Sequence, residues 1–150
     1  MRHPNLVLFM GSVAQAPVFL IITELMAAGS LRRVIKQLQR PYPMSAHSSR
    51  AISVAKDVAR GGAFLHLHNP PIIHGDLKSD NILLDMNWNG KICDFGLSRF
   101  KDAARGLSKK GTPLWCAPEV LRGDVATEAA DVYSFAMILW EVCAWAEPYL

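Results

Sequence analysis

Apolar residues in the first third of the chain predict two strands and a short helix. Leu6 to Met10 and Val18 to Glu24 are almost continuous in apolar residues, so we expect two buried strands joined by a short link containing Gly, Ser and Pro. Ser30 precedes a predicted helix from Leu31 to Leu38 and can serve as its N-cap. The stretch RPYP at 40–43 should end this helix, because proline disrupts helical hydrogen bonding.

Two longer helices are predicted in the middle and near the end of the chain. The first runs from Ser45 to His66 and is stopped by NPP at 69–71. Its apolar residues at helical spacing are Ile52, Ala55, Val58, Ala59 and Ala63. Thr127 can cap the last helix, which extends through Ala144. The chain therefore combines short strands with longer helices.

A hairpin is predicted between these two helices. Ile82–Leu84 and Lys91–Cys93 are short apolar-rich stretches on either side of the turn DMNWNG. Residues 85–96 also match the first half of a calcium-binding loop, but Gly96 stands where that loop needs a Glu. The stretch before the turn is moreover typical of a strand and not of a helix. A hairpin turn is therefore favoured over a calcium site.

The composition is that of a globular intracellular protein. Of the 150 residues 51% are apolar, and the net charge of +3 is too small to favour nucleic acid or a membrane surface as a partner. Cys93, Cys116 and Cys143 are far apart, which predicts no disulfide framework and fits a reducing compartment. The most apolar segment, Val132–Trp145, contains Glu141 and is too short to cross a bilayer. We expect a cytoplasmic chain with no membrane segment and no nucleic-acid partner.

The stretch IIHGDLKSDNILLD at 72–85 gathers the groups that phosphoryl transfer needs. Asp76 can orient an attacking hydroxyl and accept its proton, and Lys78 can place a cation near the moving phosphate. Asn81 and Asp94 supply an amide oxygen and a carboxylate, which are ligands for a hard metal ion. The predicted hairpin should bring these two ligands together.

These residues resemble the motifs of protein kinases. His-Gly-Asp-Leu-Lys with Asn at 74–81, Asp-Phe-Gly at 94–96 and Ala-Pro-Glu at 117–119 occur in the order and spacing of that family. The stretches HPNLVLFMG, LIITELMAAGSL, GTPLWCAPEV and DVYSFAMILWEV extend the resemblance over essentially the whole chain. The sequence is most similar to the tyrosine-kinase-like group of serine/threonine kinases, which includes the Raf and mixed-lineage types.

The resemblance implies an incomplete α+β kinase-like fold that forms one partial domain over residues 1–150. Residues 1–24 would be the last strands of the small lobe, 25–29 the hinge, and 30–150 the first part of the mainly helical large lobe. The implied activity is transfer of a phosphoryl group from ATP, with Mg²⁺, to a serine or threonine of a protein substrate in intracellular signalling. Neither a Gly-x-Gly-x-x-Gly loop nor a Val-Ala-Ile-Lys strand occurs in the sequence.

The resemblance also implies a role for each matching residue. Asp76 would be the catalytic base, Lys78 the phosphate-binding cation, and Asn81 and Asp94 the magnesium ligands. The ATP-binding residues would be Thr23 as gatekeeper, Glu24 and Met26 through their backbone, Ser30 near the ribose, and Leu83 below the adenine. On the substrate side, Thr112 would lie beside the acceptor hydroxyl, and Ser108 is a candidate phosphorylation site in the activation segment.

Further implied contacts concern the support of this loop. Phe9, His74 and Phe95 would stack as an internal spine anchored by Asp131. Gly75 stands where most such kinases have an Arg that pairs with a phosphate on the activation segment. A glycine there either frees the loop from that switch or simply eases a tight turn.

Less specific signals have ordinary structural interpretations. His66 and His68, two apart at a helix end, are predicted to be a packed and a surface histidine and not metal ligands. The basic stretch at 97–112 is predicted to be a solvated loop, with docking of an acidic partner as the minor alternative. For the whole chain two functions stay open, namely an active kinase of which this is a partial record and a kinase-like binding or scaffold fragment without catalysis.

Overall fold

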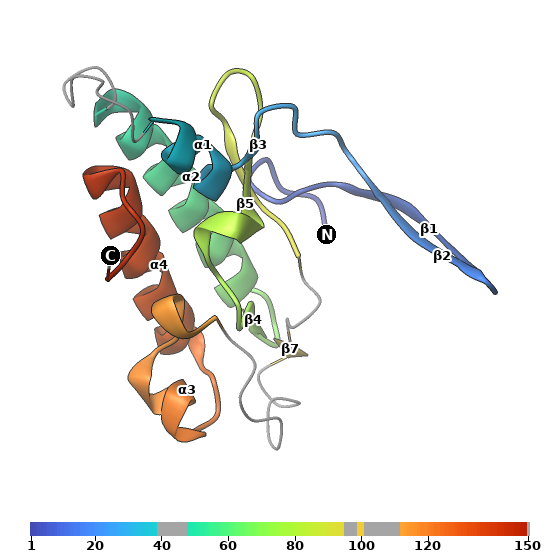
Figure 1. Ribbon diagram of the computed structural model, residues 1–150. Helices are drawn as coiled ribbons and strands as arrows, with labels where there is room; N and C mark the ends of the chain where they lie inside the picture. Colours follow the sequence, from blue (N-terminus) through green and yellow to red (C-terminus); the bar gives the residue numbers. More distant parts are fainter. Residues whose placement is uncertain (39–47, 95–98, 101–111, 150) are drawn as a thin grey trace.

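The computed structural model describes residues 1–38, 48–94, 99–100 and 112–149. Its helices lie side by side, and one long hairpin projects away from them (Figure 1). The hairpin is formed by β1 (Phe9–Gln15) and β2 (Val18–Thr23), which pair antiparallel from Phe9 opposite Thr23 to Gln15 opposite Val18. The mixture of small sheets and helices agrees with the predicted partial α+β kinase fold.

Of the predicted burial of the first two strands, only that of Leu6 and Val7 is confirmed, and the rest is wrong. Every residue of β2 and all of β1 except Gly11 are exposed, and the side chains of Phe19 and Ile21 are 72% and 77% exposed. The strand boundaries also differ, because β1 begins at Phe9 and the link is reduced to the turn at residues 16–17. A continuous apolar run indicates a strand with two apolar faces, but it does not show what covers those faces.

A second sheet lies at the base of the hairpin, in the strand order β3-β5-β6. β3 (Gly29–Ser30) pairs with β5 (Ile82–Leu84), and β5 pairs with β6 (Gly90–Ile92), both antiparallel. The predicted hairpin is therefore confirmed, although its second strand begins one residue earlier than expected. β4 (Ile72–Ile73) pairs with β7 (Arg99–Phe100) immediately before the central motif.

The helices are α1 (Leu31–Leu38), α2 (Ser48–His66), α3 (Pro118–Arg122) and α4 (Glu128–Ala144). Two 3-10 turns, η2 (Ser79–Asn81) and η5 (Pro113–Trp115), lie close to the central motif. The predicted N-cap of α1 is confirmed, because the Arg33 backbone N–H donates to Ser30 Oγ at 3.3 Å. Thr127 occupies the N-cap position of α4, but its side chain makes no capping hydrogen bond. The RPYP stretch lies outside the described residues.

The buried face of α2 differs from the predicted one. The residues buried along it are Ala51, Val54, Asp57, Val58, Gly61 and Leu65, and only Val58 belongs to the predicted set. Ile52 is 56% exposed, and with Ala55 and Ala59 it lines an apolar groove of about 500 Å³ between α2 and α4. Alanine and glycine carry little hydrophobic signal, so the apolar pattern alone placed the stripe about one position away from the true face.

The core forms where α2 packs against α4 on one side and against β6 on the other. Among its fully buried members are Leu31, Ile35, Val54, Leu65, Ile82, Leu84, Ile92, Trp115 and Ile138. In the part of the chain that the structure describes, no helix is both long and apolar enough to cross a membrane. Ile72 and Leu77 of the central motif belong to this core, so the packed core supports the backbone of the motif.

Candidate active site

The backbone of the His-Gly-Asp loop is held by one carboxylate of α4. Asp131, which is 4% exposed, accepts hydrogen bonds from the backbone N–H groups of His74 at 2.8 Å and Gly75 at 2.9 Å. The same carboxylate lies 2.9 Å from His66 Nε2 at the end of α2. Gly75 has a φ of +78°, a conformation that side-chain-bearing residues rarely adopt. Asp131 thus joins α2, α4 and the loop at one point.

Asp76, Lys78 and Thr112 form a compact polar cluster. Lys78 Nζ donates to Asp76 Oδ2 at 2.6 Å and to Thr112 Oγ1 at 2.7 Å. The Thr112 backbone N–H and hydroxyl both donate to Asp76 Oδ1, at 3.1 and 3.2 Å. The Asp76 and Lys78 side chains are 12% and 19% exposed, so the cluster is shielded but reachable. The Thr112 hydroxyl, which is distant in sequence, is therefore in direct contact with the carboxylate and the cation of the loop.

Asn81 lies directly behind this cluster and beside the second candidate metal ligand. Its side-chain amide donates to the Asp76 carbonyl at 2.8 Å, which leaves the Asn81 amide oxygen as the end that can bind a cation. The Cys93 N–H donates to the Asn81 carbonyl at 2.9 Å, so Asp94 follows immediately after this contact. An amide oxygen and a carboxylate on adjacent backbone segments form a donor set that suits Mg²⁺.

The five residues predicted to bind the nucleotide lie at and just after the end of β2, in the predicted hinge and on the second sheet. Ser30 is paired directly with Leu83 across β3 and β5, and the Ala28 N–H donates to the Leu84 carbonyl at 3.1 Å. Met26 is 7% exposed, and its carbonyl accepts a hydrogen bond from Gly29 N at 3.0 Å. The structure therefore brings Ser30 and Leu83, the predicted ribose contact and adenine floor, onto one small sheet.

Thr23 ends β2 and Glu24 follows it, directly before the predicted hinge at 25–29, and Glu24 uses its side chain for a structural contact. Its carboxylate accepts from Lys91 Nζ at 2.7 and 2.8 Å and from the Leu8 backbone N–H at 2.7 Å. The hydrogen bond from Lys91 is the main cause that lowers the pKa of Glu24. Thr23 Oγ1 donates to the Glu24 carbonyl at 3.3 Å. The ion pair ties the end of the first hairpin to β6, next to the strand that carries Leu83.

Comparison with known proteins agrees with this arrangement of motifs. A family model described as protein tyrosine and serine/threonine kinase matches residues 1–150. The chain belongs to the protein kinase family. In Arabidopsis thaliana the serine/threonine-protein kinase CTR1 and the probable serine/threonine-protein kinase SIS8 are 49% and 48% identical to it, each over 99% of the chain. The probable serine/threonine-protein kinase drkC of Dictyostelium discoideum is 45% identical over 99% of the chain.

The kinase chain covers only a small part of each relative. It spans 18% of CTR1, 14% of SIS8 and 20% of drkC. The predicted resemblance to serine/threonine protein kinases is confirmed by these matches.

The predicted internal spine of the kinase is only partly visible. His74 is 1% exposed and its Nε2 lies 3.0 Å from the Cys93 carbonyl, directly before Asp94. Phe9 is 58% exposed at the start of β1 and is not buried as a spine residue would be. Phe95 and Ser108 lie outside the described residues, as does most of the basic stretch at 97–112. The prediction that Phe9 is a buried spine residue is therefore wrong, because its side chain is exposed.

The alternative metal sites in the kinase chain are accounted for by local hydrogen bonds. Asp85 accepts from the backbone N–H groups of Asn87 at 2.8 Å and Asn89 at 2.9 Å, which makes it the organiser of a hairpin turn. His66 contacts Asp131, and His68 Nδ1 lies 3.0 Å from the Pro70 carbonyl. Within the described ranges no group of three or more His, Cys, Asp or Glu side chains could hold a metal ion.

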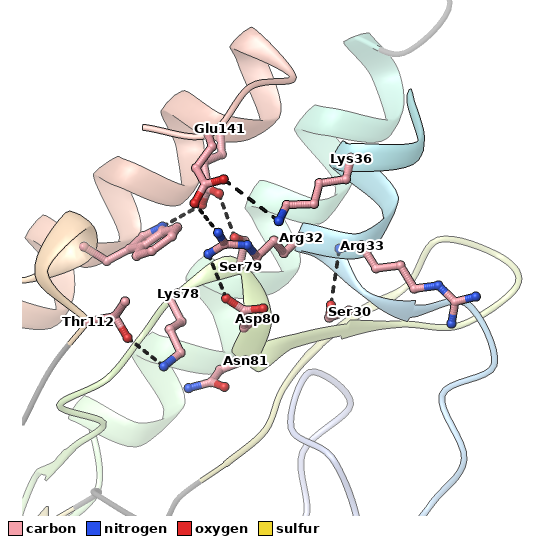
Figure 2. A network of polar contacts seen from close by, with 12 residues as sticks. Ser30, Arg32, Arg33, Lys36, Lys78, Ser79, Asp80, Asn81, Thr112 and Glu141 are labelled. Atoms are coloured by element: carbon pink, nitrogen blue, oxygen red, sulfur yellow. Dashed lines mark hydrogen bonds and ion pairs between the residues drawn. The ribbon is translucent and has the colours of Figure 1, made fainter. Parts of the chain in front are cut away.

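One polar network of the kinase was not predicted from the sequence. Glu141 on α4 is 1% exposed and accepts hydrogen bonds from Ser79 in η2 and Trp115 in η5. Burial raises the pKa of this carboxyl group to about 7. Arg32 of α1 lies beside it and bonds to Asp80 (Figure 2). The only available signal was an acidic residue inside an apolar helix, and such a signal does not identify its partners.

Proposed function

We propose that the chain carries the catalytic loop of a serine/threonine protein kinase, which transfers the γ-phosphoryl group of ATP to a hydroxyl of a protein substrate. The observation that carries this proposal is the contact of Asp76 and Lys78 with Thr112, with the Asn81 side chain bonded to the Asp76 carbonyl and 3.4 Å from its carboxylate. Lysine in this position resembles serine/threonine kinases more than tyrosine kinases.

Each residue of the cluster has a defined task in that reaction. Asp76 orients the substrate hydroxyl and accepts its proton, since its carboxylate already accepts hydrogen bonds from a neighbouring hydroxyl in this structure. Lys78 holds positive charge at the same point and stabilises charge that develops on the transferred group. Thr112 lines the place where the acceptor side chain would lie. When bound, Mg-ATP supplies the phosphoryl group and the cation that neutralises it.

The remaining assignments follow from the same proposal. Asn81 and Asp94 would hold magnesium, and the sheet that carries Ser30 and Leu83 would hold the nucleoside. Residues 1–24 would belong to the small lobe, 25–29 to the hinge and 30–150 to the large lobe of a single partial domain. Because the chain spans 20% or less of the three relatives described above, the substrate, the pathway and the intracellular setting of the whole protein are part of this proposal.

Two carboxylate substitutions in the full-length gene product test the assigned roles. Asp76→Asn keeps the shape of the side chain but removes the base, so the rate should fall by roughly 10²–10⁴ with an unchanged magnesium requirement. Asp94→Asn should slow the reaction and also raise the magnesium concentration needed for half-maximal rate, because it weakens a metal ligand. The measurement is phosphate transfer to a basic protein substrate during magnesium titrations.

Asp124→Asn is the matched control, because Asp124 is an exposed carboxylate just after α3. Near-normal rates for both Asp76→Asn and Asp94→Asn would refute the role assignment. A wild-type product that binds nucleotide but transfers no phosphate would instead support the non-catalytic binding alternative.

A further inference from the structure

Glu141 bridges two segments that are far apart in sequence. Its Oε1 accepts a hydrogen bond from Ser79 Oγ at 2.7 Å, and its Oε2 accepts one from Trp115 Nε1 at 2.6 Å. Ser79 is fully buried and Trp115 is 1% exposed, so both contacts lie inside the protein. One carboxylate from the middle of α4 therefore uses each of its oxygens for a different segment.

The two segments bonded to Glu141 lie next to the two residues of the Lys78–Thr112 contact. Ser79 directly follows Lys78 and begins η2, while Trp115 ends η5, where its backbone N–H donates to the Thr112 carbonyl at 3.0 Å. Lys78 Nζ and Thr112 Oγ1 then meet at 2.7 Å. Glu141 thus sits behind the junction between the catalytic loop and the segment that would bind the acceptor hydroxyl.

Packing alone does not explain an acidic residue at this position. An apolar side chain of similar size would fill the space without the cost of desolvating a carboxylate. The charged groups around Glu141 are Arg32, whose guanidinium lies 5.3 Å from the Trp115 ring centroid, and Asp80, which Arg32 contacts at 3.1 Å. Arg32 also pairs with Glu147, and Lys36 lies 4.0 Å from that same carboxylate. These ion pairs hold Arg32 against Trp115 and so add to the same junction.

We infer that Glu141 is a positioning residue that sets the distance between the catalytic loop and the acceptor-binding segment. It acts through Ser79 and Trp115 and does not touch the reacting groups itself. Nucleotide binding should not depend on it, because the predicted nucleoside contacts lie at the end of β2, in the segment that follows it, and on β3 and β5. The inference rests on the proposed kinase function. It adds a residue that affects how the protein substrate is positioned.

The test compares KM values for the two substrates in the full-length gene product. Glu141→Leu removes both hydrogen bonds, Ser79→Ala and Trp115→Phe remove one each, and Glu141→Gln removes the negative charge and one of the two acceptor oxygens, so kcat/KM for a protein substrate should fall in each variant, by about 10-fold or more where a bond is lost. The KM for ATP should stay within about twofold of wild type, because the nucleotide contacts are elsewhere. In addition, Trp115→Phe should cost much less in a Glu141→Leu background than alone, because Glu141→Leu has already removed the acceptor of that bond.

Asp57→Asn is the matched control for a purely structural effect. Asp57 is another buried carboxylate, 8% exposed, and it accepts a hydrogen bond from the Gly90 N–H at 2.9 Å far from the cluster. This variant should lose thermal stability without the selective loss of protein-substrate kcat/KM. If Glu141→Gln fails to fold, the Ser79→Ala and Trp115→Phe variants still decide the question.

The inference and the proposed function fail in different ways. A wild-type product that phosphorylates no protein would remove the proposed function, whatever the variants do. An active wild type whose variants leave kcat/KM for the protein substrate unchanged, or raise the KM for ATP equally, would overturn the positioning role of Glu141. Additive losses in the double variant would overturn the coupling through its carboxylate.

Discussion

At the residue scale, Gly75 has two interpretations, one from its backbone geometry and one from its missing side chain. Its φ of +78° shows that the turn uses the conformational freedom of glycine, while its N–H is fixed by Asp131. The geometry supports the interpretation that glycine eases this turn. It does not remove the second interpretation, because a glycine also leaves no guanidinium to pair with a phosphate on the activation segment.

Substituting Gly75 separates these two effects. In the full-length gene product, Gly75→Arg and Gly75→Ala carry the same backbone strain, but only the first adds a guanidinium. We expect phosphatase treatment to change wild-type and Gly75→Ala activity little, and to lower the activity of Gly75→Arg clearly. The measurement is the activity ratio before and after treatment. A large loss in the wild type would show that another cation already binds the phosphate.

The raised pKa of Glu141 predicts how the free energy of unfolding depends on pH. The folded carboxyl binds its proton more tightly than in the unfolded chain, with a pKa of about 7 instead of 4.5. Its contribution is therefore fully present below about pH 4.5 and is lost as the pH rises through 7, by roughly 3 kcal/mol at most. Since Gln does not titrate, Glu141→Gln should gain stability relative to wild type between pH 5 and pH 8, as measured by urea unfolding. A difference that stays constant with pH would show that Glu141 remains ionised in the folded protein.

At the scale of elements, two adjacent glycines of α2 provide a matched pair. A Cβ built on Gly61 would lie 2.8 Å from the Asn5 carbonyl oxygen and 2.9 Å from Ile92 Cδ1, whereas one built on Gly62 meets nothing within 4 Å. Gly61→Ala should therefore destabilise the protein by about 1–3 kcal/mol, because the helix must move away from β6 and the N-terminal segment. Gly62→Ala should stabilise it by about 0.5–1 kcal/mol through helix propensity alone.

The free energy of unfolding of the two variants measures this close approach directly. Equal effects would mean that α2 does not depend on contact at Gly61. Because Asn5 also donates through its side chain to the Gly90 carbonyl at 3.0 Å, loss of this contact should loosen the hairpin that carries Leu83 as well.

The elements that the sequence predicted best are those whose formation depends on residues next to one another in the chain. The helix Leu31–Leu38 and its Ser30 cap follow from neighbouring residues, and so does the turn organised by Asp85. The burial of β1 and β2 was predicted wrongly, because it depends on what packs over them and not on their own composition. The face of α2 was misplaced for a similar reason, since Gly61 is buried by close backbone approach and has no apolar side chain to reveal it.

The same distinction applies to the candidate site. Asp76, Lys78, Asn81 and Asp94 lie close together in sequence around one hairpin, so their proximity could be expected. The contact of Thr112 with Asp76 was implied only by the family resemblance, and the link from Glu141 to Ser79 and Trp115 was not predicted. Contacts between distant segments depend on how α4 packs against η2 and η5. The pattern of neighbouring residues in the sequence does not indicate that packing.

At the scale of the whole molecule, large apolar surfaces are exposed in the described part of the chain. The β1–β2 hairpin shows Phe19, Leu20 and Ile21 to solvent, each more than half exposed. The groove of about 500 Å³ between α2 and α4 is lined by Phe135 and Leu139 among others. Contiguous apolar surface of this kind promotes association. A polypeptide consisting of these 150 residues alone should therefore bind hydrophobic dyes and self-associate at micromolar concentration.

The same polypeptide should also be a poor enzyme, although it contains the proposed catalytic cluster. Phosphoryl transfer depends mostly on positioning of the phosphates, and its sequence contains neither the glycine-rich loop nor the strand lysine that hold them in related kinases. We expect turnover far below the range of about 1–100 per second that is typical of kinases. The measurement is phosphate transfer with Mg-ATP and a basic protein substrate, with Asp76→Asn as the background control. Turnover within that range, abolished by Asp76→Asn, would show that the hinge, the loop and the Asn81–Asp94 pair position ATP without those elements.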